Sequence, residues 1–108
     1  MLANEIHVDP FSLSDPTIKS PLSRERIRVR FVNSAPEAVD LCWVDCRGKI
    51  VRYDKLFRGQ SAVIYTYVGH FWVARFLRNG ALAYFPEYKT EIFKASKQEV
   101  VVINSKGH

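Results

Sequence analysis

Alternation of polar and apolar residues limits what this chain can fold into more than any other feature of the sequence. In RIRVRFVN, residues 26–33, every second residue is apolar: Ile27, Val29 and Phe31. Successive side chains of a β-strand point to opposite faces, so this pattern predicts a strand with one buried and one solvated face. No stretch repeats at the roughly 3.6-residue period of an amphipathic helix. The sequence therefore predicts an all-β fold.

Further strand-like segments follow at spacings of roughly ten residues, separated by turn signals such as CRGK and RNG. We expect these strands at residues 38–46, 49–53, 61–67, 71–76, 81–85, 88–94 and 97–104, with a loop at 54–60. Such a series is typical of a seven-to-eight-stranded antiparallel β-sandwich. A partly open barrel is the alternative architecture.

The chain has the length of a single domain, with 108 residues. Residues 1–22 hold three of the five prolines and show no sustained period, so we expect a flexible N-terminal arm there. Residues 23–108 then form the folded β-domain. No apolar run approaches the roughly 18 residues of a membrane span, and no secretory signal pattern is present. We therefore expect an intracellular protein, in the cytoplasm and nucleus, with no membrane partner.

The two cysteines, Cys42 and Cys46, lie in one predicted strand about 13 Å apart, too far for a disulfide bond. The three histidines are scattered along the chain and make no cluster with the cysteines. We expect two reduced, half-buried thiols, no metal and no cofactor.

Catalysis is poorly supported, because no nucleophile elbow and no glycine-rich phosphate loop is present. The sequence therefore predicts a binding protein rather than an enzyme. The net charge is +5, and four arginines alternate in SRERIRVRF: Arg24, Arg26, Arg28 and Arg30. They form either a solvated outer face or a surface that attracts an acidic partner.

A basic nucleic-acid-binding β-module is the alternative function, because basic strands with interspersed aromatic residues bind single strands by stacking. The parity of the aromatic residues argues against it. Tyr65 and Tyr67 fall on one face of their strand, whereas Thr66 falls on the other, and lysine is sparse.

The segment IYTYVGHFWVARF, residues 64–76, can be interpreted either as the wall of a pocket or as part of the core. If Val68 and Gly69 form a turn, Thr66 ends one strand and His70 opens the next, with Trp72 on the same side as His70. A hydroxyl, an imidazole and an indole at a hairpin end make a small pocket with two hydrogen-bonding groups. The other interpretation is that His70 bonds a backbone carbonyl while the rings pack as core.

The sequence also resembles a known family. The segment from Asn33 to Arg75 is similar to the β-domain of the von Hippel–Lindau tumour suppressor family without a gap, and the resemblance extends from about Ser23 to Phe93. The matching residues include Trp43, Gly48, Tyr53, Gly59, Tyr67, Gly69, His70, Trp72 and Arg75.

This resemblance implies a β-sandwich that binds a 4-hydroxyproline peptide from the α-subunit of hypoxia-inducible factor. Trp43, Tyr53 and Trp72 would wall the pocket. His70 and the Thr66 hydroxyl would bond the hydroxyproline oxygen, while Tyr65 would act through its backbone carbonyl. One parity of residues 64–76 would then pack the sandwich, and the other would face the ligand.

Three departures from the family pattern lie near the expected pocket. The family has serine at the position of Thr66, histidine at Tyr65 and proline at Asp54. Full family members also carry a helical α-domain that binds elongin C and a cullin. We expect these two partners only where such a domain is present. His70 is expected to face the ligand with little role in folding, whereas Trp43 should serve both core and pocket wall.

Overall fold

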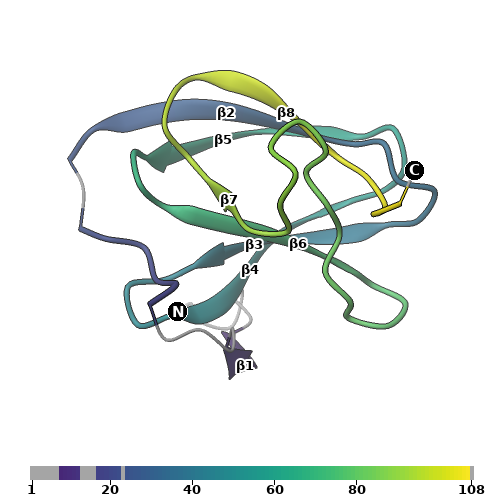
Figure 1. Cartoon of the computed structure of the whole chain (residues 1–108), viewed down its shortest axis with the longest axis horizontal. Coiled ribbons are helices and arrows are strands. Elements are labelled where there is room, and N and C mark those ends of the chain that lie inside the picture. The colour runs from purple at the N-terminus through teal and green to yellow at the C-terminus, as the bar shows by residue number, and fades with distance from the viewer. Residues whose placement is uncertain (1–7, 13–16, 23, 108) are drawn as a thin grey trace.

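The computed structural model describes residues 8–12, 17–22 and 24–107, which form two β-sheets packed face to face (Figure 1). The larger sheet has the order β1 (Val8–Ser12), β4 (Lys49–Leu56), β3 (Val39–Val44), β6 (Phe71–Phe76) and β7 (Phe93–Lys94). The smaller sheet has the order β5 (Ser61–Tyr67), β2 (Arg26–Asn33) and β8 (Glu99–Ile103). The predicted all-β sandwich is confirmed. No helix of the described residues is long and apolar enough to cross a membrane.

One strand pair differs from the expected antiparallel arrangement. β8 runs parallel to β2, with Phe31 opposite Val101, whereas the other sheet neighbours are antiparallel. Alternation within a strand fixes which side chains face the core, but it does not fix the direction of a neighbour that lies far along the chain. The sequence pattern therefore could not predict the direction of β8.

The expected strand boundaries hold in part. β4 continues to Leu56, so three of the seven residues of the expected loop at 54–60 belong to a strand, because the buried Leu56 pairs with Val39. The expected strand at 81–85 forms only isolated bridges, such as Tyr84 with Asn104. Within 88–94, only β7 is a strand. These segments bury apolar side chains, among them Phe85, without extended ladders, since turn hydrogen bonds satisfy their backbone.

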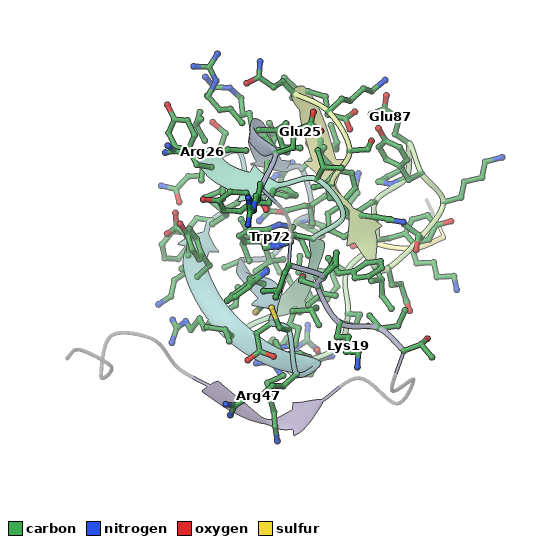
Figure 2. The ribbon with its side chains drawn as sticks, turned by 90° about the vertical axis from the view of Figure 1, so that its left-hand side faces the viewer. Lys19, Glu25, Arg26, Arg47, Trp72 and Glu87 are labelled. Carbon is green, nitrogen blue, oxygen red and sulfur yellow. The ribbon has the colours of Figure 1, made fainter. Side chains whose placement is uncertain are left out.

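Aromatic rings form the centre of the core between the two sheets. The Phe31 ring lies 5.6 Å from the Trp72 ring and 5.7 Å from the Phe93 ring, measured between centroids. Figure 2 shows Trp72 in the middle of the molecule, between the layers. A second apolar cluster covers the opposite face of the larger sheet, where Cys42 and Val73 pack against Ile18. β3 is therefore buried on both faces.

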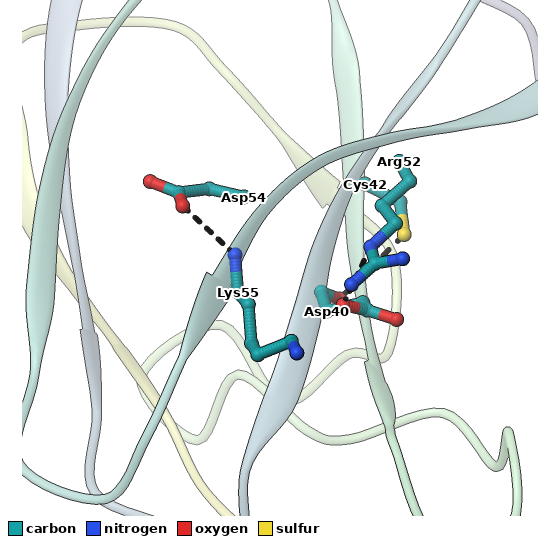
Figure 3. A network of polar contacts seen from close by, with 5 residues as sticks. All are labelled: Asp40, Cys42, Arg52, Asp54 and Lys55. Atoms are coloured by element: carbon teal, nitrogen blue, oxygen red, sulfur yellow. Dashed lines mark hydrogen bonds and ion pairs between the residues drawn. The ribbon is translucent and has the colours of Figure 1, made fainter. Parts of the chain in front are cut away.

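An ion pair between a half-exposed arginine and a buried aspartate joins two neighbouring strands of the larger sheet (Figure 3). The Nε atom of Arg52 lies 3.0 Å from Oδ1 of the buried Asp40. The Cys42 thiol donates to the backbone oxygen of Asp40 at 3.6 Å. Both cysteines are free thiols, but they are not alike as expected: Cys42 is buried and Cys46 is exposed, because only Cys42 points into the second cluster.

The N-terminal residues, expected to form a flexible arm, contribute one strand and one packed segment to the described structure. β1 pairs with the edge of β4, and Ser20 is buried. Residues 1–7 and 13–16 of the expected arm lie outside the described residues. The flexibility of residues 1–22 stays a prediction.

Candidate functional site

A small pocket of about 210 Å³ opens beside the hairpin that joins β5 to β6. It is lined by Trp43, Tyr53, Tyr65, Thr66, Tyr67, His70 and Trp72. The six residues that the sequence singled out thus lie together, although they come from four strands and one turn. Tyr67 is the one lining residue that was not selected.

The strand register brings the two tryptophans together. Trp43 on β3 lies directly opposite Trp72 on β6, and the Tyr53 ring on β4 meets the Trp72 ring edge-on at 5.2 Å. Three aromatic rings therefore form a continuous wall. Edge-to-face contacts of this kind hold rings in fixed orientations.

Trp72 belongs to the core and to the pocket at once. Its side chain is only 2% exposed, and its indole Nε1–H donates to Oγ1 of Thr66 at 2.9 Å. Thr66 is equally buried, whereas Tyr65 and Tyr67 on the same strand are exposed. The expected division of residues 64–76 was therefore wrong for β5: the parity that faces the pocket also packs the sandwich, and the other parity faces solvent.

His70 lines the pocket but is a buried side chain, which was not expected of a group with little role in folding. Its Nδ1 atom accepts a hydrogen bond from the Trp43 indole Nε1–H at 3.1 Å, and the two rings are nearly parallel. A nitrogen that accepts carries no proton, so the neutral imidazole carries its proton on Nε2. Both interpretations of the hairpin are thus partly right, since His70 bonds the backbone of Pro21 and also lines the pocket.

The environment of His70 favours its neutral form. Burial lowers the pKa of the imidazole from the usual 6.5, and the hydrogen bond to the Pro21 backbone opposes this effect without cancelling it. At neutral pH the ring is uncharged, so Nδ1 is an acceptor at the edge of the pocket, and its lone pair is taken by the Trp43 N–H.

A segment that the sequence did not select holds His70 in place. The backbone N–H of Phe71 donates to Oγ of Ser20 at 2.9 Å, and the Ser20 hydroxyl donates to the Val44 carbonyl. The next residue, Pro21, packs against Gly69, where a Cβ atom would lie 3.0 Å from the proline ring. Gly69 also has φ +90°, a conformation that other residues rarely adopt. We call residues 20–21 the brace.

The brace left no signal in the sequence, because its partners lie 24 and 51 residues away from Ser20. A serine followed by a proline is ordinary loop composition. Only the fold shows that this serine satisfies two backbone groups beside the pocket.

The rim of the pocket borders a free strand edge. β5 lies at the end of the smaller sheet, and no other strand of the described residues pairs with its outer side. Unpaired backbone groups on such an edge can add an extended peptide as a further strand. Among the described residues, no group of three His, Cys, Asp or Glu side chains could hold a metal ion.

We expect Ser20→Ala to loosen the brace and the imidazole together. The variant leaves the Phe71 N–H and the Val44 carbonyl without their partner, which should lower the free energy of unfolding by about 2–4 kcal/mol. The pKa of His70 should rise toward 6.5 as its burial is lost. Urea denaturation and an NMR titration of the His70 ring measure the two effects. Ser96→Ala, at an exposed position, is the matched control.

Ser20→Thr keeps the hydroxyl and should restore much of both quantities. An unchanged His70 pKa in a destabilised Ser20→Ala protein would contradict the positioning role of the brace.

Comparison with known families identifies the family to which this domain belongs. The family model described as VHL beta domain matches residues 18–100, a range that contains the brace and every residue lining the pocket. A search of the curated proteins found no match. The family match covers more than half of the chain and includes the whole range of the resemblance seen in the sequence. The chain belongs to the VHL β-domain family.

Proposed function

We propose that this domain recognises an extended peptide containing 4-hydroxyproline, as the substrate-binding part of a ubiquitin-ligase receptor of the von Hippel–Lindau type. The observation that carries the proposal is the pairing of a threonine hydroxyl with a neutral imidazole in a pocket walled by aromatic rings. At about 210 Å³ the pocket is smaller than typical sites for drug-sized molecules, and its size suits a single side chain.

The chemistry of the two polar groups suits a hydroxyl ligand. Thr66 Oγ1 accepts the Trp72 N–H, which leaves the threonine proton free to donate to a ligand oxygen. His70 Nδ1 has a single lone pair, which the Trp43 N–H occupies, so it can receive the proton of the same ligand hydroxyl by sharing or exchanging that bond. A hydroxyl group both accepts and donates, whereas unmodified proline offers neither function at its ring.

The hydrogen bond from Trp43 changes the expected selectivity. With a proline ligand, His70 Nδ1 keeps its bond to the Trp43 indole, and only the Thr66 proton is left without an acceptor. One unsatisfied buried group costs about 1–3 kcal/mol, which corresponds to about 5- to 150-fold discrimination. Two unsatisfied groups would double this free energy, so the indole limits the selectivity of the site.

The proposed partner is a prolyl-hydroxylated peptide of hypoxia-inducible factor α, captured in the cytoplasm and nucleus. Its backbone would run along the outer edge of β5, where Tyr65 borders the pocket. Elongin C and a cullin are proposed partners only for a chain that carries the family's helical α-domain. The role is binding rather than catalysis.

The central test is a calorimetric titration with two capped peptides that differ only in a central 4-hydroxyproline or proline. We expect the hydroxylated peptide to bind about 5- to 150-fold more tightly. Thr66→Val removes the hydroxyl at nearly constant shape and should abolish most of this ratio. Thr66→Ser, which keeps the hydroxyl, should preserve it. Equal affinities of the wild-type protein for both peptides would refute the proposal.

Trp43→Phe tests the role assigned to the indole. Without the Nε1–H donor, His70 Nδ1 has no partner when proline is bound, and it pairs fully with the hydroxyl when hydroxyproline is bound. The ratio of the two affinities should therefore increase by about tenfold, even if both affinities fall. The same pair of titrations measures it, with Tyr53→Phe as a control that keeps a ring. A decreased ratio would show that the indole supports the hydroxyl contact.

The preference for hydroxyproline should depend on pH through His70. Because the pKa of His70 lies below 6.5, the ring stays neutral down to about that pH and the affinity ratio should be constant above it. At lower pH, protonation turns Nδ1 into a donor, which repels the Trp43 N–H and cannot accept the ligand hydroxyl. The ratio should fall there. His70→Asn does not titrate and should give a flat profile; a ratio that rises in acid would contradict the acceptor role.

A further inference from the structure

The outer face of the smaller sheet carries a row of arginines that the proposed function does not use. Arg26, Arg28 and Arg30 point to solvent from β2, the central strand, while the residues between them are buried in the core. Figure 2 shows Arg26 at the outer surface, away from Trp72. Exposure of alternate residues is what the sequence predicted, but it does not explain why all three are arginine.

In the part of the chain that the structure describes, these arginines form no ion pair with an acidic side chain. Their own contacts are weak or neutral. The Arg26 guanidinium lies 4.2 Å from the centroid of the Tyr65 ring, and Nη1 of Arg30 donates to the Ser61 hydroxyl at 3.2 Å. Like charges two residues apart on a strand repel each other, and no ion pair of the described residues offsets this repulsion.

Apolar side chains flank the row. Arg30 lies directly between Val63 on β5 and Val100 on β8, and these two valines are 42% and 53% exposed. Arg28 and Arg30 line an open hollow of about 450 Å³ with Val63, Gln98, Glu99 and Val100. Exposed valines beside unpaired cations are typical of a contact surface rather than of a merely solvated face.

Glu99 is the one acidic residue among the described residues that line the hollow, and its carboxylate is hydrogen-bonded to Tyr88, which does not line it. Both carboxylate oxygens of Glu99 accept from the Tyr88 hydroxyl, at 2.5 and 2.6 Å. Glu99 raises the pKa of Tyr88 to about 12, so the phenol remains a donor at every physiological pH. Tyr88 therefore holds Glu99 at the border of the hollow.

We propose that this basic face, defined by Arg26, Arg28, Arg30, Val63 and Val100, docks a polypeptide segment in which acidic and aliphatic side chains alternate. Carboxylates on one side of an extended segment would meet the arginines as bidentate pairs, and the aliphatic groups would cover the valines. The face lies on the opposite side of β5 from Thr66, so this binding is separate from the hydroxyproline pocket.

The side chains beside the arginines favour an acidic polypeptide over a nucleic acid. The Tyr65 ring is already covered by Arg26, and valines offer no surface on which bases stack. A nucleic-acid strand would therefore gain only its backbone charge from this face.

The experiment measures fluorescence anisotropy of three labelled probes: a capped peptide of alternating glutamate and valine, its glutamine–valine counterpart, and single-stranded oligothymidylate. The wild-type protein should bind the glutamate peptide most tightly. The double variant Arg28→Gln, Arg30→Gln should bind it about 5- to 30-fold more weakly, as expected for the loss of two exposed ion pairs. Titration with the hydroxyproline peptide should be unchanged in this variant.

The matched control is the double variant Arg47→Gln, Lys49→Gln, which removes the same charge from the exposed residues of the β3–β4 hairpin. It should alter the affinity for the glutamate peptide by less than about twofold. An equal loss in both double variants would show a net-charge effect and overturn the proposal. Tighter binding of oligothymidylate, or no binding of the glutamate peptide, would overturn it as well.

Discussion

The indole of Trp72 is the group on which both the core and the pocket depend. Its ring packs against Phe31 at the centre of the sandwich and against Tyr53 at the wall of the pocket. A buried indole N–H needs an acceptor, because leaving it unsatisfied costs stability. Thr66 supplies that acceptor, and its own hydroxyl proton is not used in this bond. The same hydrogen bond stabilises the fold and prepares the site.

The ring nitrogens of His70 are also satisfied by groups of the domain itself. The Trp43 indole satisfies Nδ1, and the brace at residues 20–21 fixes the turn that carries the ring. An imidazole with both nitrogens engaged is stable when the pocket is empty, so the site does not depend on a ligand for its shape. This preorganisation lowers the entropic cost of binding. It also limits discrimination, since a satisfied acceptor loses less when the wrong ligand arrives.

The sequence predicted the class of fold and three of the pocket residues from local properties, whereas Trp43, Tyr53 and Tyr65 were expected only from the family resemblance. Period-two alternation gave the faces of β2, and the spacing of Thr66, His70 and Trp72 indicated a shared hairpin end. The direction of β8, the partial strand at Phe93 and the role of Ser20 depended on contacts between distant segments. The parity error at β5 has another cause. Rings were assumed to be core, yet Tyr65 and Tyr67 are exposed at the rim, where a phenol can remain hydrated.

Strand β5 separates two surfaces with different chemistry. Its inward residues, Ile64 and Thr66, meet the core and the pocket, while Val63 and Tyr65 face the arginines of β2. Because alternate side chains of one strand point to opposite faces, a substitution at an outward position changes the basic face without displacing Thr66. Tyr65 is the exception, since it borders the pocket and also carries the Arg26 guanidinium on its ring. A ligand that displaced this ring would therefore disturb both surfaces, which makes Tyr65 the residue through which the two sites are physically connected.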